Sequence, residues 1–172
     1  GGLLSSATEI SGLFLKKGVV LIEDFGDDEE KIIFKVQDGL VLQIQGENER
    51  IYNRNAAYAG LEDIPIVVLI DGSSASASEL VAGAWQDHGV ATIIGQTSFG
   101  KGTVQSSRQL LNDGGLYLTV ARWLTPEGNW INDYGITPDI EVEIPEGITF
   151  DEEDDPYMDA AIDFILSENE KS

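Results

Sequence analysis

A serine and a lysine lie in two short motifs whose residue types could support nucleophilic catalysis. Ser76 belongs to the run Ser-Ala-Ser-Ala-Ser-Glu that starts at Ser74, and Lys101 belongs to the run Phe-Gly-Lys-Gly-Thr-Val-Gln that starts at Phe99. A serine hydroxyl attacks a carbonyl only when a base takes its proton. The chain has no cysteine and a single histidine, His88, which lies in a polar stretch. A serine with a lysine base therefore fits better than a serine-histidine-aspartate triad.

The serine motif allows a catalytic and a structural interpretation. It follows a predicted buried strand and a tight turn and opens a predicted helix, where the free N–H groups of the first turn could receive an oxyanion. The same residues also form a capping box, in which Ser76 caps the helix and Glu79 reaches back. Local spacing does not decide which serine would be the nucleophile, and the candidates are Ser73, Ser74, Ser76 and Ser78.

Lys101 lies between two glycines in a predicted loop after a buried strand, and glycines let a backbone approach a neighbour closely. A lysine acts as a base only after losing its proton, so we expect the Ser76 helix to bury it. The alternative is an exposed loop lysine. Gln105 follows in a predicted strand, on the same face as Lys101 and Thr103. It could orient the lysine amine, or it could be an edge-strand glutamine that faces water.

Two other motif matches are weaker. Residues 95–101 match a phosphate-binding Gly-x-x-x-x-Gly-Lys, but Gly102 stands where Ser or Thr would bind magnesium, and β-branched residues follow instead of a helix. Ser98 and Lys101 also match Ser-x-x-Lys, which requires a helical turn that Gly100 disfavours. We therefore rank nucleotide binding, and Ser98 as a nucleophile, below the Ser76 hypothesis.

Composition indicates one acidic domain. The chain has 172 residues, 42% of them apolar, and a net charge of -21 from 31 Asp and Glu against 10 Lys and Arg. Such a surface repels a phosphate backbone, so nucleic acid is a poor partner. The acidic runs at 23–30, 47–49 and 151–155 have no spaced His or Cys beside them, which favours solvated surface over a metal site. The absence of cysteine leaves the compartment open.

No apolar stretch reaches the roughly 18 residues that a membrane-spanning helix needs. The chain opens in mid-pattern at Gly1-Gly2 without an initiator Met, so we expect a piece of a longer protein. Hydrophobic periodicity and turn residues predict an α/β fold with a parallel crossover around the helix at Ser76. The predicted helices are 3–14, ended by Lys16-Lys17-Gly18, 76–89 and 156–166, the last followed by a frayed tail at 168–172. The predicted strands are 19–22, 32–36 and 41–44, with a hairpin turn at Asp38-Gly39 between the last two. They continue with a strand at 64–70 buried on both faces, 91–94, and a hairpin of 103–111 with 116–124.

Four segments together resemble the carboxyl-terminal processing proteases, or tail-specific proteases, of serine peptidase family S41. They are Gly12-Leu13-Phe14, the serine motif, the lysine motif and Gly135-Ile136-Thr137-Pro138-Asp139-Ile140. The resemblance covers nearly the whole chain. It implies that Ser76 is the nucleophile, Lys101 the general base and Gln105 the residue that positions the lysine. It also implies an oxyanion hole formed by the backbone N–H groups of Ala77 and Gly2.

The resemblance further implies a crotonase-like α/β core of mixed sheet and flanking helices, with residues 1–172 as the catalytic core. Members of the family carry an upstream PDZ domain, cut proteins near the carboxyl end outside the cytoplasm through an acyl-enzyme, and use no metal or organic cofactor. We expect the PDZ domain, the N-terminal region and the strand before the glycine run to lie outside residues 1–172. Residues 23–46 look longer than the usual connection, and homo-oligomer formation is left open. The alternative function is a non-catalytic binding or scaffolding module on the same fold.

Overall fold

The computed structural model of the protein describes residues 1–54, 64–144 and 155–170. Its helices are α1 (Leu4–Phe14), α2 (Ala77–Asp87) and α3 (Pro156–Asn169), with a 3-10 turn, η1, at Leu111–Asp113. Its strands are β1 (Lys17–Asp24), β2 (Ile32–Gln37), β3 (Leu40–Gln45), β4 (Asn48–Asn53), β5 (Val67–Ile70), β6 (Thr92–Gly95), β7 (Thr103–Gln109), β8 (Gly115–Leu124) and β9 (Ile140–Glu141).

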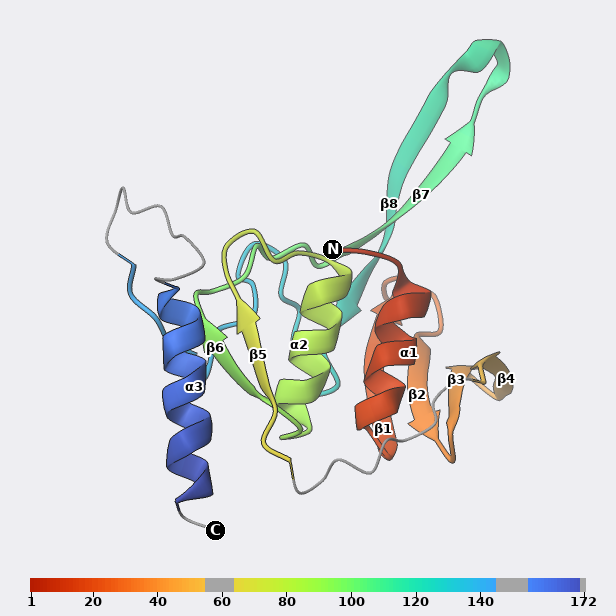
Figure 1. The fold of residues 1–172 in the computed structure, drawn as a ribbon. Helices are drawn as coiled ribbons and strands as arrows, with labels where there is room; N and C mark the ends of the chain where they lie inside the picture. Colours follow the sequence, from red (N-terminus) through yellow and green to blue (C-terminus); the bar gives the residue numbers. More distant parts are fainter. Residues whose placement is uncertain (55–63, 145–154, 171–172) are drawn as a thin grey trace.

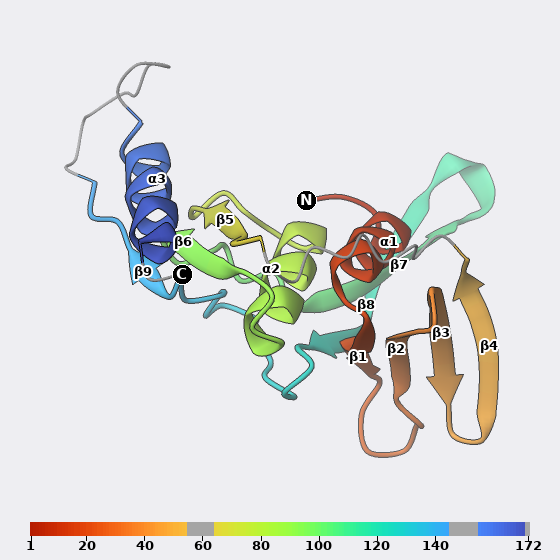
Figure 2. The same ribbon diagram turned by 60° about the horizontal axis from the view of Figure 1, so that its bottom comes forward.

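The strands form two sheets with helices beside them. An antiparallel sheet has the order β4-β3-β2-β1-β8-β7, and a smaller parallel sheet has the order β5-β6-β9. Helix α2 lies between the two sheets, α3 flanks the smaller sheet, and α1 packs beside α2 over the larger one (Figures 1 and 2). This arrangement confirms the predicted α/β class with mixed strands and flanking helices. In the described part of the chain, no helix has the length and apolar character that crossing a membrane requires.

The crossover that carries the serine motif forms as predicted. Strand β5 runs parallel to β6, and α2 connects them. Strand β5 is shorter than the predicted 64–70, however, and it is not buried on both faces, since Ile64 and Leu69 are exposed. Strand β5 is an edge strand of the described three-stranded sheet, so no strand lies beside its outer side to help cover its side chains.

Helix α1 (Leu4–Phe14) agrees with the predicted 3–14, but Gly18 belongs to β1 and does not cap the helix. Leu3 and Ile10 are exposed, whereas the buried residues are small: Ala7, Thr8, Ser11 and Gly12. Small side chains allow the backbones of α1 and α2 to approach closely, which brings the first residues of the chain near the start of α2.

Both predicted hairpins form. The β2–β3 turn is made by Asp38 (φ 51°) and Gly39 (φ 75°), the left-handed pair that a type I′ turn requires. Strands β7 and β8 pair in antiparallel fashion and extend beyond the body of the molecule as a two-stranded arm (Figure 1). The root of this arm lies beside α2.

The prediction that residues 23–30 form solvated surface is wrong for the first two. Glu23 and Asp24 are buried at the end of β1. Asp24 is held by Lys31 at 3.4 Å and by Arg122 at 3.1 Å, so its charge is compensated inside the fold. Hydrogen bonding from the Gly26 N–H, with these two cations, lowers the pKa of Asp24.

Helix α3 begins as predicted and ends later. Asp155 caps it by accepting hydrogen bonds from the N–H groups of Tyr157 and Met158. The helix continues to Asn169, so the predicted fraying from residue 168 is wrong for its last turn. Residues 151–154 of the third acidic run, and residues 171–172, lie outside the described residues.

Candidate active site

Ser76 occupies a strained position immediately before α2. Its backbone has φ 58° and ψ -118°, the conformation of the first central residue of a type II′ turn, where glycine dominates. The preceding turn is held by the Asp71 carboxylate, which accepts hydrogen bonds from the N–H groups of Ser73 at 2.9 Å and Ser74 at 3.1 Å. A strained residue between a strand and a helix presents its side chain outward, as in nucleophile elbows.

The structure distinguishes Ser76 from the other candidate serines. Ser76 lines a pocket, and Ser73 and Ser78 are absent from the residues that line it. The Ser74 hydroxyl is engaged with Asp71. Ser98 is buried, donates a hydrogen bond of 2.6 Å to Glu79 and accepts one of 2.7 Å from the Ile136 N–H, so its hydroxyl serves the fold.

Glu79 ties the two motifs together. Its side chain is buried, and its Oε2 accepts hydrogen bonds from the N–H groups of Ser76 at 2.6 Å and Lys101 at 3.0 Å. Its Oε1 accepts 2.6 Å hydrogen bonds from Ser98 Oγ and from the Gly100 N–H. The predicted capping box is therefore present, but the carboxylate also fixes the loop that carries Lys101. The spacing of Ser76 and Glu79 in the sequence predicts only the capping of α2. The contact of Glu79 with the loop that carries Lys101 depends on the tertiary structure, so it could not be predicted from spacing.

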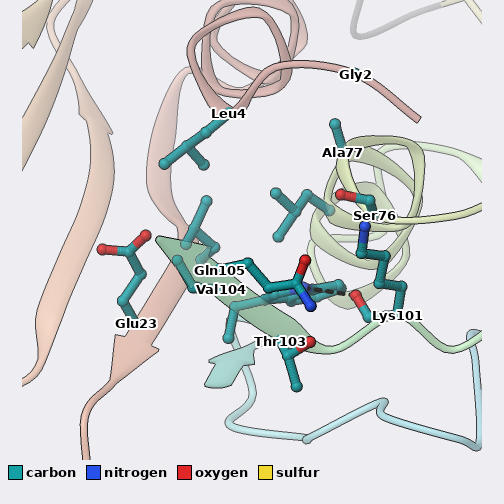
Figure 3. A pocket seen from close by; sticks show the side chains of 12 residues that line it. Gly2, Leu4, Glu23, Ser76, Ala77, Lys101, Thr103, Val104 and Gln105 are labelled. Atoms are coloured by element: carbon teal, nitrogen blue, oxygen red, sulfur yellow. Dashed lines mark hydrogen bonds between the residues drawn. The ribbon is translucent and has the colours of Figure 1, made fainter. Parts of the chain in front are cut away.

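Lys101 and Gln105 line the same pocket as Ser76. The Lys101 side chain extends toward the Ser76 hydroxyl (Figure 3). The expected burial of Lys101 is not found, since the residue is exposed. A bulge between Val104 and Gln105 breaks the strand alternation, so Val104 lines the pocket together with Thr103 and Gln105.

The first residues of the chain lie against the start of α2 (Figure 3). A Cβ atom on Gly2 would lie 3.7 Å from the Ala77 Cβ, and one on Gly1 would lie 3.3 Å from the Ala75 carbonyl oxygen. Neither the Gly2 nor the Ala77 N–H donates a hydrogen bond to any residue in the described ranges. Both donors are therefore available at the edge of the pocket.

The pocket has a volume of about 250 Å³ and contains one acidic residue that sequence reasoning missed. Glu23 is 9% exposed, and burial raises the pKa of its carboxyl. Strand alternation in the sequence could have indicated that Glu23 faces the pocket, because it places Glu23 on the same face of β1 as Leu21. The complete lining is Gly2, Leu4, Leu21, Glu23, Ser76, Ala77, Leu80, Lys101, Thr103, Val104, Gln105 and Trp123.

The single histidine lies outside the pocket, and the acidic side chains of the described residues do not form a metal-binding cluster. His88 follows the last turn of α2, where its Nε2 lies 2.7 Å from the Val19 carbonyl oxygen, and it does not line the pocket. Within residues 1–54, 64–144 and 155–170, no three His, Asp or Glu side chains gather closely enough to hold a metal ion.

The chain belongs to peptidase family S41, whose model matches residues 1–142. It is 43% identical over 147 residues to a carboxy-terminal-processing protease of Bartonella bacilliformis, across 84% of this chain. It is 33% identical over 160 residues to the carboxy-terminal processing protease CtpA of Bacillus subtilis, across 93% of this chain. The chain spans 29% of the length of each of these relatives.

Solved structures agree with this assignment. The photosystem II D1 C-terminal processing protease superposes with a TM-score of 0.59 at 28% identity, over 83% of this chain and 32% of that protein. A protein of Parabacteroides merdae superposes with a TM-score of 0.65 over all of this chain and 50% of its own, and at 18% identity it supports the fold alone. The family resemblance predicted from the four sequence segments is confirmed.

Proposed function

We propose that the chain is the catalytic core of a serine endopeptidase that cleaves protein substrates near their carboxyl termini through a Ser76–Lys101 dyad. One observation carries the proposal. The strained Ser76 and the side chain of Lys101 meet in one pocket, and a single buried carboxylate, that of Glu79, holds the backbones of both residues. The names of the relatives support the reaction class, since they are carboxy-terminal processing proteases.

In the proposed reaction, Ser76 Oγ attacks the carbonyl carbon of the scissile peptide bond while the neutral Lys101 amine takes its proton. The tetrahedral intermediate collapses to an ester on Ser76, and the departing amine receives the proton from Lys101. Water then attacks the ester with Lys101 again as base, which releases the acid and restores the serine.

The proposed oxyanion hole consists of the Ala77 and Gly2 N–H groups. Both are free of intramolecular acceptors among the described residues and lie at the edge of the pocket beside Ser76. Gln105 lies in the pocket with Lys101 and is proposed to position the lysine amine. These roles follow the family resemblance residue by residue.

The test is covalent labelling of the full-length protein with a serine-reactive fluorophosphonate. We expect labelling of the wild type and none of Ser76→Ala or Lys101→Ala. Ser73→Ala is the matched control, because Ser73 is exposed in the same turn and does not line the pocket. Labelling that persists in Ser76→Ala, or that survives loss of Lys101, would refute the dyad.

The partners and location of the full-length protein remain predictions from the family. We propose a PDZ domain that recruits substrate C-termini and a location outside the cytoplasm, with oligomer formation left open. Cell fractionation with an antibody against the full-length protein tests the location, and a cytoplasmic signal would contradict it.

A further inference from the structure

We propose that the pocket beside Ser76 binds a basic side chain of the substrate and that the Glu23 carboxylate selects it. This inference rests on the proposed function, since it assumes that a polypeptide reaches Ser76 through this pocket. It adds a specificity-determining residue at a position where the sequence suggested only solvated surface.

The shape of the pocket suits a side chain with an apolar stem and a polar end. Its walls include apolar side chains from α1, β1, α2, β7 and β8, namely Leu4, Leu21, Leu80, Val104 and Trp123. Glu23 lies at the end opposite Ser76 and Lys101 (Figure 3). The volume of about 250 Å³ is below the roughly 300–1,000 Å³ of pockets for drug-sized ligands, so one side chain fits better than a larger ligand.

Glu23 has neither a hydrogen-bond nor an ion-pair partner within the described part of the chain, although the residue is only 9% exposed. Its charge acts on Tyr52, whose pKa is raised by burial and then by Glu23, but this neutral phenol supplies no counter-charge. The neighbouring Asp24 is the opposite case, since Arg122 and Lys31 both contact it. A buried carboxylate without a counter-charge is costly. A cation entering the pocket would supply the missing interaction.

A basic side chain satisfies this carboxylate better than a neutral one. An ionised carboxylate only accepts hydrogen bonds, and lysine and arginine bring donors that carry charge. Their methylene stems would lie along the apolar walls. Lys101 does not neutralise Glu23, because it lies at the other end of the pocket beside Ser76 (Figure 3). The net charge of -21 also raises the local concentration of cationic segments near the protein.

The experiment uses the full-length protein and fluorogenic peptides that differ at one residue flanking the scissile bond. Lysine, arginine, norleucine and glutamate are placed in turn on each side of the bond. Norleucine keeps the lysine stem and removes the charge. We expect kcat/KM for the lysine peptide to exceed that for the norleucine peptide by roughly tenfold or more on one side of the bond. Glu23→Gln should bring this ratio close to one, and the exposed control Glu29→Gln should keep it.

A binding measurement separates this inference from the proposed function. The same peptides, carrying a fluorescent label, are titrated into Ser76→Ala and into Ser76→Ala with Glu23→Gln, and anisotropy reports their affinities. A lysine preference that depends on Glu23 would support the selectivity even if the wild type cleaves nothing, in which case the proposed function alone fails. Cleavage with the same lysine-to-norleucine ratio in wild type and Glu23→Gln overturns the selectivity and leaves the peptidase intact. Absence of both cleavage and preferential binding overturns both.

Discussion

The backbone of Ser76 has a stability consequence that can be measured. A residue with a Cβ at φ 58° and ψ -118° pays about 1–3 kcal/mol of strain, which glycine avoids. We expect Ser76→Gly to be more stable than Ser76→Ala by about 1 kcal/mol after the greater chain entropy of unfolded glycine is included. Urea unfolding of the two variants, neither of which has a hydroxyl, isolates the strain. Equal or greater stability of Ser76→Ala would mean that the turn is relaxed.

The Glu79 carboxylate gives a second prediction at the scale of a residue. Its two oxygens accept four hydrogen bonds, and a glutamine amide would place a donor against some of these donors. We expect Glu79→Gln to lower the free energy of unfolding by about 2–3 kcal/mol and to weaken fluorophosphonate labelling of Ser76.

Glu127→Gln is the control for Glu79→Gln, since Glu127 is exposed and its variant should change stability by less than about 0.5 kcal/mol. A Glu79→Gln protein with wild-type labelling and stability would show that the carboxylate does not organise the pocket.

At the scale of elements, the approach of the chain's first residues to α2 can be tested through one N–H group. Gly2→Pro removes the proposed oxyanion donor, and Gly2→Ala keeps it, with an ordinary contact of 3.7 Å to the Ala77 Cβ. We expect kcat to fall about 10²–10³-fold in Gly2→Pro and to stay near wild type in Gly2→Ala. Melting temperatures of both variants control for folding. Equal losses in the two variants would point to packing rather than to the donor.

Strand β1 carries two adjacent carboxyl groups whose pKa values move in opposite directions. The pKa of Asp24 is lowered from 3.8 and that of Glu23 is raised from 4.5. The stabilisation from Asp24 is therefore complete above pH 3.8 and disappears as the pH falls through its lower folded-state pKa. The penalty from Glu23 is absent below pH 4.5 and grows as the pH rises through its higher folded-state pKa.

We expect Asp24→Asn to destabilise the protein at pH 7 and to approach the wild type at pH 3 or below. Glu23→Gln should stabilise the protein at pH 7 and lose this advantage near pH 4. Urea unfolding of both variants beside the wild type across this range checks the signs. Parallel pH profiles for the two variants would contradict the opposite environments of the two groups.

At the scale of the whole molecule, the charge of -21 should affect the association of substrates. Long-range attraction of cationic segments is screened as the Debye length shrinks from about 20 Å at low salt to below 10 Å. We expect kcat/KM for a lysine-rich peptide to fall about threefold or more between 20 mM and 300 mM salt. A neutral peptide of the same length should change little. A shared response of both peptides would indicate an effect of salt on the protein itself.

The architecture was largely predictable because it depends on local patterns. Alternation, turn residues and the crossover rule placed most elements, and the Asp38-Gly39 turn was predicted together with its strands. The environments of Glu23 and Lys101 were not predictable in this way. Glu23 belongs to an acidic run, and its burial depends on the strands that β1 pairs with. The exposure of Lys101 depends on what covers one side of a pocket, which no local pattern encodes.

The four hydrogen bonds of Glu79 can form only late in folding. The groups that its carboxylate holds come from the start of α2 and from the loop after β6, so they meet only after the chain has completed the β5-α2-β6 crossover. A nascent or partly unfolded chain has the serine and the lysine but no shared anchor between them. Under the proposed dyad mechanism, catalysis therefore requires the completed crossover.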